Sequence, residues 1–197
     1  DITKPRLTIK TPPVLPDSSN DGFSGRINPG PTDVAAIFFT SGTTGRPKGV
    51  RHRLDSLVGN VISFNRAMGL GREMRMFHVL PMAYMAGFLN TLLSPMMAGG
   101  QVILGPRFSP ISALDFWTPA ADQGANTLWI SPTIGATLCR VVRDQERARH
   151  AVSKFRNIFC GTAPLHSAVR RQFHEIFGVA LQESYGTSEL LLVSAQD

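Results

Sequence analysis

The sequence predicts an α/β fold, with a mainly parallel sheet flanked by helices on both faces. Short apolar runs alternate with longer stretches of helical periodicity between residues 76 and 183. Parallel strands need a long crossover connection, so this alternation favours parallel pairing. With 197 residues, 43% of them hydrophobic, the chain can bury one sizeable core.

Two parts of the chain differ in composition. Six prolines, interspersed with Ser, Asn, Asp and Gly, predict a loop-rich arm over residues 1–33. The α/β domain is expected over residues 34–197. It begins with an apolar strand at residues 34–39 and a return strand at residues 49–53, so the stretch between them forms a long hairpin loop.

Helices and strands then alternate along the domain. The helices have apolar residues three and four positions apart, whereas the strands are short apolar runs. Ser109 and Pro110 open one helix as its N-cap and first residue, and Gly178 closes the last helix. In chain order we expect a helix at 55–68, a strand at 76–80, a helix at 85–97, a strand at 101–104, a helix at 109–123, a strand at 127–130, a helix at 133–149, a strand at 157–160, a helix at 166–177 and a strand at 179–183.

The hairpin loop at residues 40–49 has the composition of a polyphosphate site. Its ten residues include four hydroxyls, three glycines and two cations. Glycines let successive backbone N–H groups converge on an anion, and hydroxyls and a lysine add donors. The Walker spacing is not met, and the alternative is a surface turn with a chance lysine. The candidate phosphate-binding residues are Thr40, Ser41, Gly42, Thr43, Thr44, Gly45 and Lys48.

This loop resembles the phosphate loop of the adenylate-forming superfamily, which contains acyl- and aryl-CoA synthetases, luciferases and peptide-synthetase adenylation domains. Residues 80–87 are similar to its L-P-x-x-H-x-x-G segment, with Tyr84 in place of histidine. Residues 161–165 resemble its G-[AG]-A-P-L turn, and residues 183–189 its Y-G-x-T-E motif, with Ser188 in place of threonine. The resemblance is greatest to acyl-CoA synthetases and implies a fragment of the family's N-terminal domain.

The resemblance implies that ATP activates a carboxylic acid as an acyl-adenylate, which then passes to a thiol. ATP, Mg²⁺ and coenzyme A as co-substrate are the implied ligands. Lys48, Ser188 and Glu189 would be catalytic, with Ser188 on the α-phosphate and Glu189 on the metal. Further residues would bind the nucleotide, with the Tyr185 ring stacked on adenine: Gly161, Thr162, Ala163, Pro164, Glu183, Ser184, Tyr185 and Gly186.

The acid pocket would be lined by small and apolar groups. These are Tyr84, Met85, Gly87, Ser131, Pro132, Gly161, Gly186 and Thr187. Amino-acid-activating members usually carry an aspartate near residues 80–87, and no acidic residue lies between Glu73 and Asp115 here. A carboxylic acid without an α-amino group is therefore favoured, and an aryl, polycyclic or fatty acid is compatible with the lining.

Charge and cysteine content bound the remaining classes. The net charge is +6, but arginines at positions 140, 143, 147, 149, 170 and 171 are expected on helices without interleaved aromatics, which disfavours nucleic acid. No apolar run is long enough to span a membrane, and no signal peptide is seen. Cys139 and Cys160 are expected to be reduced and buried, which favours a cytoplasmic location. The five histidines show no metal spacing, and residues 186–190 lack the final glycine of a hydrolase nucleophile elbow.

The family's ribose-binding aspartate and lysine-bearing C-terminal domain would lie beyond the Y-G-x-T-E motif. We therefore expect the remainder of the ligase to be missing from this chain. The alternative is a non-catalytic nucleotide-binding or interaction module derived from the same fold.

Overall fold

The computed structural model describes residues 8–10, 29–40 and 47–196. Within them, seven strands form one sheet in the order β1-β5-β4-β6-β7-β8-β9. The five strands from β5 to β8 are parallel, whereas β1 and β9 pair antiparallel at the two edges. The strands are β1 (Thr8–Lys10), β4 (Arg75–His78), β5 (Gln101–Leu104), β6 (Thr127–Ile130), β7 (Asn157–Cys160), β8 (Gln182–Thr187) and β9 (Leu191–Ala195). The predicted α/β class is confirmed.

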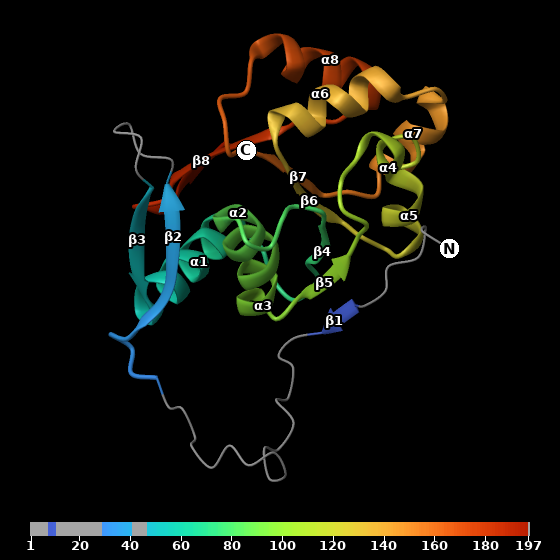
Figure 1. The fold of residues 1–197 in the computed structure, drawn as a ribbon. Coiled ribbons are helices and arrows are strands. Elements are labelled where there is room, and N and C mark those ends of the chain that lie inside the picture. Colours follow the sequence, from blue (N-terminus) through green and yellow to red (C-terminus); the bar gives the residue numbers. More distant parts are fainter. Residues whose placement is uncertain (1–7, 11–28, 41–46, 197) are drawn as a thin grey trace.

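The predicted hairpin forms a separate two-stranded sheet. Its strands are β2 (Val34–Thr40) and β3 (Lys48–Arg53), which pair antiparallel with Thr40 opposite Lys48. The side chain of Phe38 faces inward and its ring centroid lies 6.0 Å from that of Phe88. Figure 1 shows the hairpin at the left, beside the left-hand end of β8.

Helices cover both faces of the main sheet (Figure 1). One face carries α1 (Leu54–Ala67), α2 (Met85–Phe88), the π-helical segment η1 (Leu89–Leu93) and α3 (Ser94–Ala98). The other carries α4 (Pro110–Ala113), α5 (Trp117–Asp122), α6 (Pro132–Val141), α7 (Gln145–Val152) and α8 (Ser167–Phe177).

Aromatic side chains join the layers. The Phe64 ring of α1 lies 5.4 Å from Trp129 of β6 and 5.7 Å from Phe159 of β7, measured between centroids. On the opposite face, Trp117 of α5 lies 5.3 Å from Phe177 of α8. Edge-to-face and tilted aromatic pairs at these distances add to the stabilisation from burial.

The order of the strands determines where a ligand can bind. The chain passes from β4 to its neighbour β5 and then crosses back to β6 on the other side of β4. Because crossovers are right-handed, this reversal places the connecting helices on opposite faces. Ligands of open α/β sheets bind outside the carboxyl ends of the strands, where such reversals occur.

Two predicted helices are each interrupted in the structure, whereas the helix expected at 85–97 continues without a break through α2, η1 and α3. The helix expected at 109–123 is α4 and α5, and Pro119 is the third residue of α5, where a proline is tolerated. The helix expected at 133–149 is α6 and α7. Val142 is extended after α6, and the carboxylate of Asp144 then accepts from the backbone N–H of Arg147 at 2.9 Å, which caps α7.

Other differences lie at the ends of the sheet. The last predicted strand, 179–183, is displaced, since β8 begins at Gln182 and continues through Tyr185 to Thr187. The expected arm includes a strand, β1, which pairs with β5. The predicted caps are confirmed: Ser109 forms a capping box with Ser112, and Gly178 ends α8 with φ 76°.

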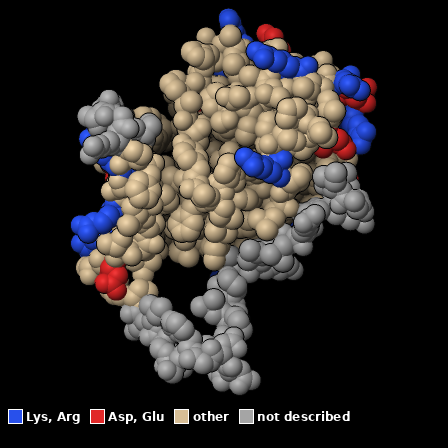
Figure 2. Space-filling model, viewed as in Figure 1, with Lys and Arg blue, Asp and Glu red and all other residues tan. Residues whose placement is uncertain are grey.

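Cysteines and charges agree with the sequence analysis. Cys139 and Cys160 are free and buried, and burial raises the pKa of their thiols to about 11 and about 12. Arg149 donates from Nε to the Ile176 carbonyl at 2.8 Å, near the C-terminus of α8. On the face seen in Figure 2, Lys and Arg stand in separate groups, several beside Asp or Glu. No helix among the described residues is long and apolar enough to cross a membrane.

A buried histidine at the end of β4 predicts a pH-dependent stability. Nδ1 of His78 lies 2.5 Å from Oγ1 of Thr91, which itself donates to the Gly87 carbonyl at 2.8 Å. Burial lowers the pKa of His78 below its usual 6.5, so the unfolded chain takes up the proton more readily than the folded chain. Stability from the neutral ring is complete above pH 6.5 and falls as the pH drops below it.

We therefore expect a lower Tm at pH 5.5 than at pH 7.5, and a smaller difference for His78→Asn, whose amide can still donate to Thr91. Thermal unfolding monitored by circular dichroism measures both. An equal pH dependence of the Tm in the two proteins would show that His78 is not its cause.

Candidate active site

Two adjoining cavities lie at the carboxyl edge of the sheet. The turn cavity, of about 370 Å³, is lined by Thr162, Ala163, Pro164, Glu183, Ser184, Tyr185, Gly186, Ser194 and Gln196. The α2 cavity, of about 230 Å³, is lined by Tyr84, Met85, Ala86, Asn90, Thr162, Ser184, Gly186, Thr187, Ser188, Leu191 and Leu192. They share Thr162, Ser184 and Gly186, so a ligand that extends from one into the other passes these three residues.

The turn after β7 approaches β8 closely at Gly161. A Cβ added to this buried glycine would lie 2.3 Å from Oγ and 2.9 Å from the carbonyl oxygen of Ser184. The next residue, Thr162, has φ 75°, which is rare for a β-branched residue. Strained backbone of this kind clusters at ligand-binding sites, and Thr162 lines both cavities.

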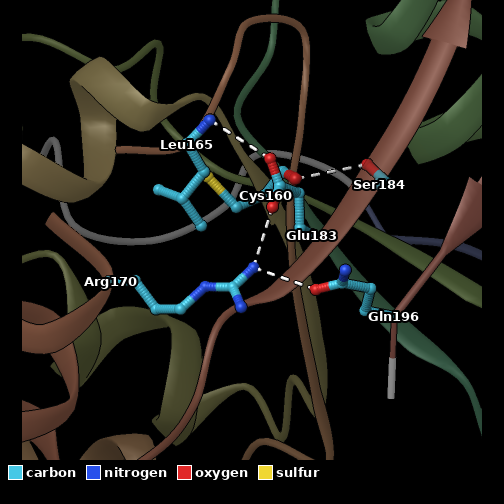
Figure 3. A network of polar contacts seen from close by, with 6 residues as sticks. All are labelled: Cys160, Leu165, Arg170, Glu183, Ser184 and Gln196. Carbon is cyan, nitrogen blue, oxygen red and sulfur yellow. Dashed lines mark hydrogen bonds and ion pairs between the residues drawn. The ribbon is translucent and has the colours of Figure 1, made fainter. Parts of the chain in front are cut away.

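The carboxylate of Glu183 holds this turn in place (Figure 3). Oε1 accepts from the backbone N–H of Leu165 at 3.2 Å, and Oε2 accepts from Nη2 of Arg170 at 2.8 Å. The same Nη2 lies 3.1 Å from Oε1 of Gln196, which follows β9. Glu183 therefore ties the turn, α8 and the end of β9 together, in addition to lining the turn cavity.

Tyr185 and Gly186 lie on β8 itself, not in a loop after it. The Tyr185 side chain is 58% exposed at the turn cavity, so its flat face is available to a planar ligand. A Cβ added to Gly186 would lie 2.3 Å from the Leu191 carbonyl oxygen. Glycine thus permits the close approach of β9 to β8 beside both cavities.

Ser188 and Glu189 lie in the connection from β8 to β9. Ser188 lines the α2 cavity, and its carbonyl oxygen accepts a hydrogen bond from Nε2 of the buried His52 at 2.6 Å. Because His52 is on β3, this bond fixes the hairpin to the predicted α-phosphate and metal motif. Glu189 is exposed and lines neither cavity.

The structure describes the predicted phosphate loop only at its ends. Thr40 ends β2, and the exposed Lys48 begins β3. Ser41, Gly42, Thr43, Thr44 and Gly45 lie outside the described residues.

The predicted acid pocket is gathered in part. Tyr84, Met85, Gly186 and Thr187 line the α2 cavity, and Gly161 lies buried beside it. Ser131 instead caps α6, since its Oγ accepts from the Ile134 N–H at 3.2 Å, and Pro132 is the first residue of that helix. Gly87 is buried, and an added Cβ would lie 2.0 Å from the Pro81 carbonyl oxygen. These last three residues are outside both cavity linings.

Sequence reasoning missed residues that act over long separations. His52 and Arg170 hold the motifs described above, and Asn90 lines the α2 cavity. Asn60 of α1 exchanges two hydrogen bonds with the backbone of Leu192, at 2.8 and 3.2 Å. Single polar residues within helical or strand patterns give no local signal of such partners.

Known proteins resemble this chain over most of its length. The family model for "AMP-binding enzyme" matches residues 6–197. A sulfoacetate–CoA ligase of Cupriavidus necator is 34% identical over 177 residues, which cover 90% of this chain and 33% of that enzyme. The mitochondrial malonate–CoA ligase of Homo sapiens is 29% identical over 164 residues, which cover 79% of this chain and 28% of that enzyme.

Solved structures share the fold. ATP-bound MatB from Rhodopseudomonas palustris aligns with a TM-score of 0.74 and 28% identity, over 86% of this chain and 32% of that one. A malonyl-CoA ligase with methylmalonyl-CoA and AMP bound aligns with a TM-score of 0.75 and 27% identity, over 84% of this chain and 35% of that one. The chain thus spans about a third of the length of these relatives.

Proposed function

The chain belongs to the AMP-binding enzyme family, and we propose that it is the nucleotide- and acid-binding part of a ligase that joins a carboxylic acid to coenzyme A at the expense of ATP. The junction of the two cavities at Thr162, Ser184 and Gly186 carries the proposal. Adenylation requires a carboxylate and a nucleotide to meet at one phosphorus atom, and two adjoining cavities would allow two reactants to lie in that relation.

The proposed reaction has two steps. A carboxylate oxygen attacks the α-phosphorus, the bond from that phosphorus to the oxygen bridging to the β-phosphate breaks, and pyrophosphate leaves. The sulfur of coenzyme A then attacks the acyl carbon, the thiol loses its proton, and AMP leaves with the electron pair of the acyl–oxygen bond. Both steps bring anionic groups together, so the protein mainly positions them and offsets their charge.

Each motif has a proposed part in this chemistry. Adenine would stack on the exposed ring of Tyr185 and face the backbone of residues 161–164. The hydroxyl of Ser188 would donate to the α-phosphate. Thr40 and Lys48, with the loop between them, would bind the β- and γ-phosphates.

The carboxylate of Glu189 is suited to a metal ion that binds together with the nucleotide. Among the described residues, no group of three or more His, Cys, Asp or Glu could hold a metal ion. Mg²⁺ is commonly held by one or two carboxylates together with substrate phosphates and water, and the exposed Glu189 offers one such carboxylate. A bound Mg²⁺ would neutralise part of the phosphate charge.

The substrate is proposed to be an acid without an α-amino group. Sulfoacetate and malonate, after which two relatives are named, are short acids with a second acidic group. A short acid of this kind is therefore a candidate substrate, in addition to the aryl, polycyclic and fatty acids that are compatible with the predicted pocket lining. A cytosolic setting is also part of the proposal, supported by the free thiols of Cys139 and Cys160.

ATP–pyrophosphate exchange by the complete ligase, of which this chain is proposed to be a part, tests the proposed function, because the chain without the lysine-bearing domain is expected to be incomplete for catalysis. We expect exchange that depends on an added carboxylic acid and on Mg²⁺, with AMP as a competitive inhibitor. Binding of AMP without exchange for any acid would favour the alternative of a non-catalytic module.

Loss of the His52 hydrogen bond should weaken ATP binding. In His52→Leu the Ser188 carbonyl loses its partner, and one such bond is typically worth about 1 kcal/mol, or roughly a fivefold rise in KM for ATP. Pyrophosphate exchange at varied ATP measures KM, with the exposed His150→Leu as the matched control. An unchanged KM in His52→Leu would show that the hairpin is positioned without this contact.

A further inference from the structure

One polar side chain in the α2 cavity lacks a partner. Asn90 is 4% exposed, and its Oδ1 makes no hydrogen bond in the described part of the chain. An unpaired buried amide oxygen is costly, so native proteins rarely leave one without a role. Since Asn90 lines the α2 cavity, a ligand in that cavity can supply the missing partner.

Asn90 takes no part in the hydrogen bonds made by its neighbour Thr91. Asn90 lies in η1, and π-helical segments are frequent at functional sites. Its neighbour Thr91 is fully buried and is satisfied by His78 and by the Gly87 carbonyl. The two adjacent polar residues therefore differ. The hydrogen bonds of Thr91 stabilise the fold, whereas the amide oxygen of Asn90 has no partner and can bind a ligand in the α2 cavity.

Size and charge limit what the α2 cavity can take. Its volume of about 230 Å³ is below the range of roughly 300–1,000 Å³ typical of pockets for drug-sized ligands. No Lys, Arg, His, Asp or Glu is among its described lining residues, so recognition there depends on hydrogen bonds and apolar contacts. Besides Asn90 and the junction, Tyr84, Thr187 and Ser188 bring hydroxyl groups to the lining, whereas Met85, Ala86 and Leu192 contribute apolar surface.

We propose that Asn90 is a specificity-determining residue, and that the α2 cavity takes a short carboxylic acid whose far end carries a second hydrogen-bonding group. This rests on the proposed function, in which the acid's reacting carboxylate lies at the junction of the cavities. A terminal amide can turn either its oxygen or its nitrogen toward a ligand, so it can meet a donor such as a hydroxyl or an acceptor such as a carboxylate. A plain alkyl chain would leave the amide oxygen of Asn90 buried and unpaired.

Binding of non-hydrolysable acyl-sulfamoyl adenosines tests this directly. The probes carry malonyl, 3-hydroxypropionyl, butyryl and dodecanoyl groups, and calorimetry measures their affinities. We expect at least tenfold tighter binding of the malonyl or the hydroxypropionyl probe than of the butyryl probe, and the weakest binding for dodecanoyl. The first two probes distinguish an anionic from a neutral second group.

Variants then assign the preference to Asn90. Asn90→Leu should abolish the preference for the polar probe, and Asn90→Ala, which leaves more space, should abolish it as well. Asn157→Leu, at the amino-terminal end of β7 and away from the carboxyl ends of the strands, is the matched control and should keep the preference for the polar probe. AMP affinity and thermal unfolding of each variant report whether the turn cavity is folded.

Equal affinity for polar and butyryl probes, or a preference that survives both Asn90 substitutions, would overturn the proposal. Tight, selective binding without pyrophosphate exchange would support the role of Asn90 while contradicting the ligase activity. Exchange with butyrate or dodecanoate as the preferred acid would support the ligase activity while contradicting the role of Asn90.

Discussion

Gly161→Ala is expected to lower the affinity for AMP and ATP by at least tenfold, which corresponds to about 1.4 kcal/mol. The added Cβ would lie 2.9 Å from the backbone oxygen of Ser184, so either the turn or β8 must move. Both elements line the turn cavity, and a shift of either displaces the groups that would hold adenine. Calorimetric titration with AMP measures the loss.

Gly59→Ala is the matched control, because a Cβ at this exposed position in α1 meets no atom within 4 Å. Alanine is also the better helix former, so the control should be as stable as the parent protein or more stable. If Gly161→Ala binds AMP as the control does, the turn is not part of the nucleotide site.

Glu189→Gln is expected to reduce the rate of pyrophosphate exchange by roughly a hundredfold or more, the usual cost of losing one group that stabilises charge in a transition state. The substitution keeps the shape of an exposed side chain, so the Tm should not change. Exchange measured at saturating ATP and varied Mg²⁺ should show a higher requirement for the metal.

Glu175→Gln, on the exposed part of α8, removes the same charge outside the motif and outside both cavity linings, and is the control. Comparable loss in both variants would indicate an effect of net charge. Full activity of Glu189→Gln would show that another group holds the metal.

The strands were predictable because burial on both faces demands continuous apolar runs. The run from Asn157 to Cys160 and the run from Thr127 to Ile130 appear in the structure at the expected residues. The hairpin was likewise predictable from two short strands around a glycine-rich loop.

Helix interruptions were harder, although the sequence held signals of both. Pro119 cannot lie deep in a helix without removing a hydrogen bond, and it marks the first turn of α5. Asp144 interrupts an apolar periodicity as an N-cap residue does. In each case the apolar stripe continues across the break, because both short helices pack on the same face of the sheet.

The motifs near the site were predictable as segments, but their supporting contacts were not. Residues 161–164 and 183–186 converge as expected, although only the first segment follows a strand, β7, whereas the second lies within β8. The bond from His52 to the Ser188 carbonyl joins residues 136 positions apart, and no local pattern predicts it. The unpaired amide oxygen of Asn90 is visible only once the packing around η1 is known.

A crystal structure with a non-hydrolysable acyl-adenylate analogue tests the central claim most directly. We expect the adenine in the turn cavity against Tyr185, the sulfamoyl group beside Ser188 at the junction, and the acyl group in the α2 cavity. A ligand bound elsewhere in the protein, with both cavities lacking it at saturating concentration, would contradict the account.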